Sequence, residues 1–221
     1  MKQILFVGNS FTYFNDMPYL FSTLANQAGF DNYTGSVVLG GWWLNRYADP
    51  EDRMGRVLRE EYPKRDWDFI IWQDQSFNPA GDPADFLAAA RTLRALCPCK
   101  KQVYYQTWAY EEGTEKLDGT GMTYAQMRDA LRASYRQAAA ECEGLCVPVG
   151  DAFSLCKERH PEIGLYKPDH YHPSLAGSYL AACLFFACLS GRSPLELGTP
   201  AELPESDAEL LRRVAQDTLN I

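Results

Sequence analysis

Short apolar runs alternate with longer helix-type stretches along nearly the whole chain, and this alternation restricts the fold more than any other feature. Five runs are typical of strands, because they are short, rich in β-branched and aromatic residues, and bounded by polar residues or glycine. They span residues 2–7, 33–39, 68–72, 102–107 and 145–149. Strands that alternate with helices require crossover connections, so we predict a mostly parallel sheet that helices cover on both faces.

Helix-type stretches fill most of the sequence between these runs. Pro18 suits the first turn of a helix, and Thr123 and Gln126 have the spacing of a capping box before a long helix. Helices are predicted for residues 18–28, 53–62, 84–96, 123–141, 174–189 and 207–219. Residues 111–121 are predicted to form a glycine-containing loop. No linker or low-complexity tract interrupts the pattern, so we expect residues 1–221 to form a single domain.

Composition and charge exclude several classes of function. The net charge is −8 and the pI is about 4.9, and an acidic surface repels the phosphates of nucleic acids. No apolar stretch reaches transmembrane length, so no membrane partner is expected, and residues 179–189 predict a buried helix instead. The seven cysteines are odd in number and irregularly spaced, which favours reduced thiols in a cytoplasmic protein over a metal site.

Four segments come directly after predicted strands. They are Ser10, Gly40–Gly41, Gln73–Ser76 and Trp108–Tyr110. Because the carboxyl ends of parallel strands meet at one edge of a sheet, and ligands bind outside that edge, we expect these segments to surround a single site.

Ser10 and the pair Asp169-x-x-His172 supply the residue types of a nucleophilic serine site. A serine hydroxyl is a weak nucleophile at neutral pH, so it needs a base within hydrogen-bond reach and a third group that orients the base. We predict Ser10 as nucleophile, His172 as base and Asp169 as the orienting acid. Asp151 is an alternative acid, and His170 is expected to face solvent.

These residues resemble the sequence blocks of the SGNH hydrolase superfamily, the GDSL-type esterases and lipases. The first block, Gly-Asp-Ser, matches Gly8-Asn9-Ser10, and the glycine of the second block matches Gly41, or Gly40 after a one-residue slip. The third block, Gly-x-Asn-Asp, falls on the poorly matching stretch Gln73-Asp74-Gln75-Ser76. The fifth block, Asp-x-x-His, matches residues 169–172. The chain most resembles a subgroup with Gly-Asn-Ser and Gln-x-Gln-Ser blocks.

The resemblance implies a three-layer, flavodoxin-like α/β fold with a central five-stranded sheet. It also implies a serine esterase that hydrolyses small acyl esters, above all acetyl esters, through an acyl-enzyme intermediate and without a cofactor or metal. The implied oxyanion donors are the backbone N–H groups of Ser10 and Gly41 and the side-chain amide of Gln75, or of Gln73 if the register differs.

An acetyl ester on a carbohydrate is the substrate class that we favour, from the resemblance and from aromatic residues near the predicted strand ends. These residues fit either a stacking wall for a sugar or ordinary core packing: Trp42, Trp43, Trp72, Trp108 and Tyr110. The helically spaced Arg128, Arg132 and Arg136 are expected to form a solvated face.

Two other functions are compatible with the same fold class. One is a catalytically weak or inactive ligand-binding protein, because a fold does not determine a function and the third block is poorly matched. The other is a flavin- or nucleotide-binding protein. Residues 9–15 contain neither a Gly-x-Gly-x-x-Gly motif nor a P-loop lysine, and the bulky Phe11, Tyr13 and Phe14 would crowd a phosphate.

Overall fold

A wholly parallel sheet forms the centre of the protein. The computed structural model describes residues 1–220 of the chain. The sheet has five strands in the order β2-β1-β3-β4-β5, which is the flavodoxin-like order, and this confirms the predicted fold class. The strands are β1 (Lys2–Gly8), β2 (Asn32–Val38), β3 (Phe69–Trp72), β4 (Lys101–Tyr105) and β5 (Leu145–Val147).

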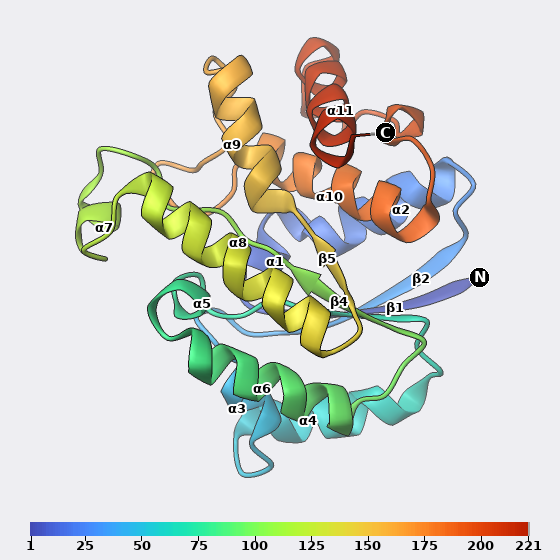
Figure 1. Cartoon of the computed structure of the whole chain (residues 1–221). Coiled ribbons are helices and arrows are strands. Elements are labelled where there is room, and N and C mark those ends of the chain that lie inside the picture. The colour runs from blue at the N-terminus through green and yellow to red at the C-terminus, as the bar shows by residue number, and fades with distance from the viewer. Residues whose placement is uncertain (221) are drawn as a thin grey trace.

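Helices cover both faces of the sheet (Figure 1). One layer contains α2 (Met17–Gln27), α9 (Val149–Arg159), α10 (Leu175–Ser190) and α11 (Glu205–Leu219). The other contains α3 (Leu44–Ala48), α4 (Arg53–Glu61), α5 (Asn78–Gly81), α6 (Pro83–Leu96) and α8 (Tyr124–Glu141). The short helices α1 (Ser10–Tyr13) and α7 (Glu115–Asp118) lie in segments that follow β1 and β4.

Helix α10 is the most deeply buried helix of its layer. Its residues from Ala176 to Ala187 are all buried, which agrees with the predicted buried helix. Phe185 shows why: its ring meets Phe6 of β1 at 5.2 Å and Tyr105 of β4 at 4.8 Å between centroids, both in edge-to-face geometry. Within residues 1–220, no helix combines the length and apolar character needed to cross a membrane.

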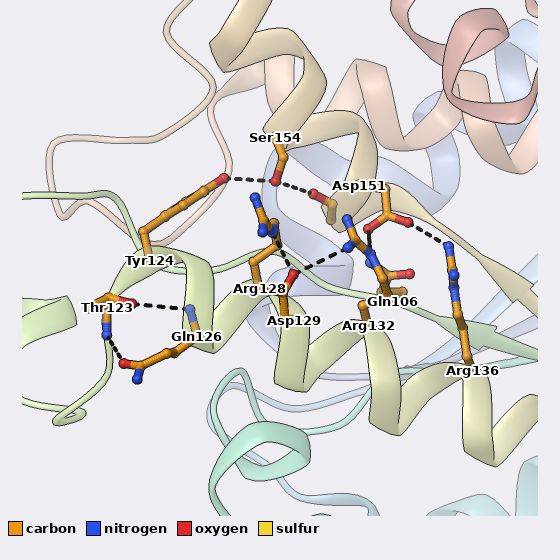
Figure 2. A network of polar contacts seen from close by, with 11 residues as sticks. Gln106, Thr123, Tyr124, Gln126, Arg128, Asp129, Arg132, Arg136, Asp151 and Ser154 are labelled. Atoms are coloured by element: carbon orange, nitrogen blue, oxygen red, sulfur yellow. Dashed lines mark hydrogen bonds and ion pairs between the residues drawn. The ribbon is translucent and has the colours of Figure 1, made fainter.

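The helix boundaries largely follow the predictions, with one clear omission. Thr123 and Gln126 form the predicted capping box at the start of α8 (Figure 2). Helix α9, in contrast, begins at Val149, where the sequence predicted the end of a strand. Gly150 allows this abrupt change, because a Cβ there would lie 2.1 Å from the backbone oxygen of Thr107. The predicted loop 111–121 also contains the single short helix α7.

Candidate active site

Ser10 lies at the first position of α1, directly after β1. Its neighbour Asn9 is the N-cap of this helix, because the Asn9 Oδ1 accepts a hydrogen bond of 3.1 Å from the backbone N–H of Phe11. Asn9 therefore has the capping function that a serine could have had, and the hydroxyl of Ser10 is left for other contacts.

The structure brings Ser10 together with the distant pair Asp169 and His172. The Oγ of Ser10 lies 2.8 Å from Nε2 of His172, and Nδ1 of His172 lies 2.8 Å from Oδ2 of Asp169. The second oxygen of Asp169 accepts the backbone N–H of His172 at 3.0 Å. With Nδ1 donating to the carboxylate, Nε2 is free to accept the serine proton, which is the tautomer that a general base requires.

The surroundings of His172 keep its ring in one orientation. Its ring lies 4.2 Å from that of Phe14 in a stacked arrangement and 4.1 Å from the tilted ring of Tyr171, between centroids. Burial disfavours the charged form of Asp169, but hydrogen bonds from the side chain and backbone of His172 and from the backbone of Tyr171 outweigh it. The pKa of Asp169 is therefore lower than usual, so the acid stays ionised beside the imidazole.

Two backbone N–H groups near Ser10 are free to bind an anionic oxygen. Gly41 occupies a turn in which the N–H of Trp42 donates to the oxygen of Leu39 at 3.1 Å, and its φ of +70° favours glycine. Within residues 1–220, the N–H groups of Ser10 and Gly41 donate to no other protein atom. Gly40 lines the cavity beside Gly41, so both glycines of the predicted pair are at the site.

Gln75 and Gln73 differ sharply in their surroundings. Gln75 lines the cavity, and its Oε1 accepts the backbone N–H groups of Phe77 at 2.8 Å and Asn78 at 3.0 Å. These contacts orient the amide and leave its NH2 group with one long contact, 3.3 Å to Ser76 Oγ. Gln73 is fully buried. Its Oε1 accepts from the Asn9 N–H at 2.9 Å and the Thr12 hydroxyl at 2.8 Å. Of the two, only Gln75 can reach a bound ester.

A cavity of about 400 Å³ opens beside Ser10 and His172. None of the five aromatic residues that fitted either a stacking wall or core packing lines this cavity. Trp72 and Trp108 are buried in the core, and Tyr110 is buried with its hydroxyl 2.6 Å from Ser76 Oγ. The aromatic residues that line the cavity are instead Phe11, Tyr13, Phe14 and Tyr171. Within residues 1–220, no three His, Cys, Asp or Glu side chains are grouped as metal ligands would be.

The chain is similar to several solved structures of other proteins. No protein-family model and no curated protein matches the chain. A solved structure from Slackia heliotrinireducens, provisionally named an SGNH hydrolase, is 29% identical, with a TM-score of 0.76 over 85% of this chain and 98% of that one. The chain belongs to the SGNH superfamily of serine ester hydrolases.

Two further structures share the SGNH fold with this chain. A DUF4886 family protein from Bacteroides uniformis has a TM-score of 0.85 at 19% identity and covers 99% of this chain and 95% of its own. A mutant of a Geobacillus acetyl-xylooligosaccharide esterase has a TM-score of 0.57 at 19% identity, over 92% and 97% of the two chains. At these identities the similarity concerns the fold.

Asn9 replaces the aspartate of the first SGNH block, and the structure gives a reason. Its Nδ2 donates to the backbone oxygens of Trp42 at 2.9 Å and Asp74 at 3.3 Å. One amide thus connects the loops that follow β1, β2 and β3, which carry Ser10, Gly41 and Gln75. An ionised aspartate has no proton to donate to either oxygen.

Asp74 also connects two of these loops, and the sequence did not single it out. The carboxylate is fully buried and accepts the backbone N–H groups of Leu44 and Gln75, each at 2.7 Å, and Nδ2 of Asn78 at 2.7 Å. Burial raises the pKa of Asp74 to about 6, although these hydrogen bonds favour the charged form. The only sequence signal was its place directly after a strand.

Asp151, the alternative acid, has other partners. It lies in the first turn of α9 and binds Arg132 Nε at 2.7 Å, Arg136 at 3.0 Å and the amide of Gln106 at 2.8 Å (Figure 2). It is therefore not the residue that contacts His172. Arg132 and Arg136 are partly exposed, as predicted for a solvated face, and they also connect α8 to α9 through this carboxylate.

His170 lies between Asp169 and His172 in the sequence but does not contact Ser10. Its side chain is 51% exposed, and its Nδ1 lies 2.8 Å from a carboxylate oxygen of Glu111. Its φ of +65° turns the chain between Asp169 and His172. The backbone oxygen of His170 accepts the N–H of Glu111 at 2.9 Å, so this turn contacts the start of segment 111–121.

Proposed function

We propose that the protein is a serine esterase that removes small acyl groups, above all acetyl, from alcohols through an acyl-enzyme intermediate. The observation that carries the proposal is the unbroken series of hydrogen bonds from Asp169 through His172 to Ser10, which ends beside a cavity of about 400 Å³. We assign Ser10 as nucleophile, His172 as general base and acid, and Asp169 as the residue that orients His172.

In the first half of the reaction, Ser10 Oγ attacks the carbonyl carbon while its proton passes to Nε2 of His172. The negative charge that develops on the carbonyl oxygen is accepted by the N–H groups of Ser10 and Gly41 and by the amide of Gln75. When the intermediate collapses, the bond to the alcohol oxygen breaks and His172 returns the proton to that oxygen. The acyl group stays on Ser10.

In the second half, a water molecule repeats the attack on the acyl-enzyme. His172 takes a proton from the water, the same donors stabilise the second oxyanion, and the carboxylic acid leaves as Ser10 recovers its proton. Asp169 remains ionised throughout, in keeping with its lowered pKa. Every proton transfer uses groups of this chain, so the proposed reaction requires neither metal nor cofactor.

A small acyl group on a carbohydrate is the substrate that we favour. The cavity is near the lower end of the size range of ligand pockets, which suits an acetyl group together with part of an alcohol. Tyr13 and Tyr171 supply aromatic surface at the cavity for the apolar face of a sugar ring. The fold similarity to an acetyl-xylooligosaccharide esterase is consistent with this choice.

A cytoplasmic location and a single domain over residues 1–221 complete the proposal. All seven cysteines are free thiols, as a reducing compartment would maintain them. All seven are also buried or half-buried, and burial raises the pKa of Cys183 and Cys188 to about 12, which keeps these thiols protonated and unreactive.

The decisive experiment is covalent labelling of the purified protein with a fluorophosphonate. The expected result is one label, located on Ser10 by peptide mass spectrometry and lost in Ser10→Ala. Turnover of 4-nitrophenyl acetate should exceed that of the octanoate. An unlabelled wild-type protein that circular dichroism shows to be folded would refute the esterase and favour a ligand-binding protein on this fold.

A further inference from the structure

Lys116 is the one permanently charged side chain in the lining of the cavity beside Ser10, among the described residues. The remaining lining residues are glycines, neutral polar or aromatic residues and His172. Lys116 belongs to the short helix α7 in segment 111–121, so the sequence region that was predicted as a loop contributes one wall of the site.

The ammonium group of Lys116 is held in place by aromatic rings. Its Nζ lies 4.3 Å from the ring centroid of Tyr171 and 5.3 Å from that of Tyr110, within the range of cation–π contacts. Within residues 1–220 it forms no ion pair. Two carboxylates of adjoining segments are engaged elsewhere: Glu111 binds His170 and Asp169 binds His172. Lys116 is exposed, so its charge is available to a ligand.

Tyr171 connects this charge to the histidine that must protonate the leaving alcohol. The ring of Tyr171 contacts that of His172, whose Nε2 must protonate the departing alcohol oxygen. A second lysine lies near another neighbour of the imidazole, outside the cavity lining: Lys167 Nζ is 5.0 Å from the ring centroid of Phe14, which stacks on His172. Both ammonium groups therefore lie over aromatic rings that contact the ring of His172.

A second cavity, of about 690 Å³, also has Lys116 in its lining, together with Glu115 and Asp169. These two carboxylates make the second cavity unfavourable for an anion. A negative group of the substrate is therefore expected in the first cavity, close to the ester, while an uncharged remainder of the alcohol can extend past Lys116 into the second.

We propose that Lys116 selects esters whose alcohol part carries a negative group near the ester oxygen. The inference rests on the proposed esterase function and narrows its substrate class to acetylated alcohols that carry a carboxylate or a sulfate, such as an acetylated sugar acid. Lys116 does not take part in bond making. It binds the anion and so lowers KM for charged substrates.

A matched pair of substrates tests this selection. 4-Acetoxybenzoate carries a carboxylate, and methyl 4-acetoxybenzoate has the same acyl group without the charge; 4-acetoxybenzenesulfonate serves as the sulfonate arm. The measured quantity is the ratio of kcat/KM for the anionic and the neutral ester. An exposed ion pair predicts that Lys116→Met lowers this ratio by about two- to fivefold and that Lys116→Arg restores it.

Salt and a control variant separate this role from a structural one. Raising ionic strength should lower the ratio in the wild type and have a smaller effect in Lys116→Met, because screening acts on the ion pair. Lys101→Met removes the same charge at the first residue of β4, at the amino ends of the strands and so away from the site, and should leave the ratio unchanged. Equal labelling of Ser10 by fluorophosphonate in all variants would show that the site is intact.

The outcomes distinguish this inference from the proposed function. If the neutral ester is hydrolysed and the ratio is the same in wild type and Lys116→Met, the selection is refuted and the esterase stands. A fall in kcat/KM for both esters by the same factor would also refute it, because a displacement of segment 111–121 would affect charged and neutral esters alike. If the wild type hydrolyses neither ester, both proposals fail.

Discussion

The Oγ of Ser10 lies 2.8 Å from Nε2 of His172, although 162 positions separate the two residues in the chain. Asn15 explains how the two segments stay together. Its Nδ2 donates to the backbone oxygens of Pro173 and Ser174, each at 3.0 Å, and its φ of +54° lies in the left-handed region that asparagine tolerates. The turn after β1 is thereby attached to the segment that carries the histidine.

The two neighbouring histidines should differ in their effect on turnover. His172→Ala removes the base, so we expect kcat on 4-nitrophenyl acetate to fall by about 10²- to 10⁴-fold. His170→Ala, which removes only the contact with Glu111, should change kcat less than about threefold. A larger loss in His170→Ala would overturn the assignment of the base.

Gln75 and Gln73 should separate catalysis from stability. Gln75→Glu keeps the Oε1 that accepts the N–H groups of Phe77 and Asn78 but loses the NH2 donor, so kcat should fall by about 10²- to 10³-fold. Gln73→Ala removes the acceptor of the Asn9 N–H and should lower the free energy of unfolding by about 1–3 kcal/mol. Kinetics and urea unfolding of both variants check this. Normal turnover in Gln75→Glu would exclude Gln75 as an oxyanion donor.

The two candidate acids should behave differently as well. Asp169→Ala leaves the imidazole without its orienting partner, and we expect kcat to drop by up to about 10⁴-fold. Asp151→Ala breaks the bridge to Arg132 and Arg136, which are both partly exposed, so the expected loss is about 1 kcal/mol in stability with little change in kcat. Steady-state kinetics beside thermal unfolding measure the two effects. A catalytic defect in Asp151→Ala as large as that of Asp169→Ala would contradict the assignment.

Asn9→Asp restores the residue of the first superfamily block and should nevertheless harm this protein. An ionised carboxylate would face the backbone oxygens of Trp42 and Asp74 without a proton to donate. We expect a loss of about 1–3 kcal/mol in the free energy of unfolding, together with reduced turnover because Gly41 and Gln75 lose their connection. Unfolding in urea at neutral pH measures the loss. A variant as stable and active as the wild type would show that this amide contributes no connection between the loops.

Asp74 should give the stability a pH dependence of its own. Its pKa in the folded protein is raised to about 6 from an ordinary 3.8, so the folded state binds the proton more tightly. The resulting stabilisation is complete below about pH 4 and is lost as the pH rises through about 6, to a total of roughly 3 kcal/mol. The unfolding free energy of the wild type minus that of Asp74→Asn should therefore decrease as the pH is raised from 4 to 7. A constant difference would mean that Asp74 titrates normally.

The strands, most helices and the sheet edge that carries the candidate site could be predicted from the sequence because they follow from local patterns, whereas the flavodoxin-like strand order was implied by the family resemblance. The runs around β1, β3 and α10 are strongly apolar, and strand ends that precede Ser10 and Gln75 mark one edge of a parallel sheet. Helix α9 could not be found in this way, since it follows β5 with no loop and has a glycine in its first turn.

The walls and supports of the site depend on long-range contacts that no local pattern records. The roles of Asn9 and Asp74 arise from contacts with backbone atoms of other loops, and backbone oxygens leave no trace in a sequence. Trp72 and Trp108 fitted either a stacking wall or core packing, and both are buried in the core. Tyr171, which lies between His170 and His172 in the sequence, lines the cavity instead and carried no sequence signal of that role. Lys116 lies in a segment whose placement against Tyr171 is purely tertiary.

Asn9 and Asp74 connect the loops that carry Ser10, Gly41 and Gln75, whereas segment 111–121 contributes Lys116 to the lining of the cavity. Randomising that segment in a laboratory-evolution library should therefore retarget the enzyme to new alcohols without disturbing its chemistry. Substrate preference and catalytic rate are then determined by different parts of the chain.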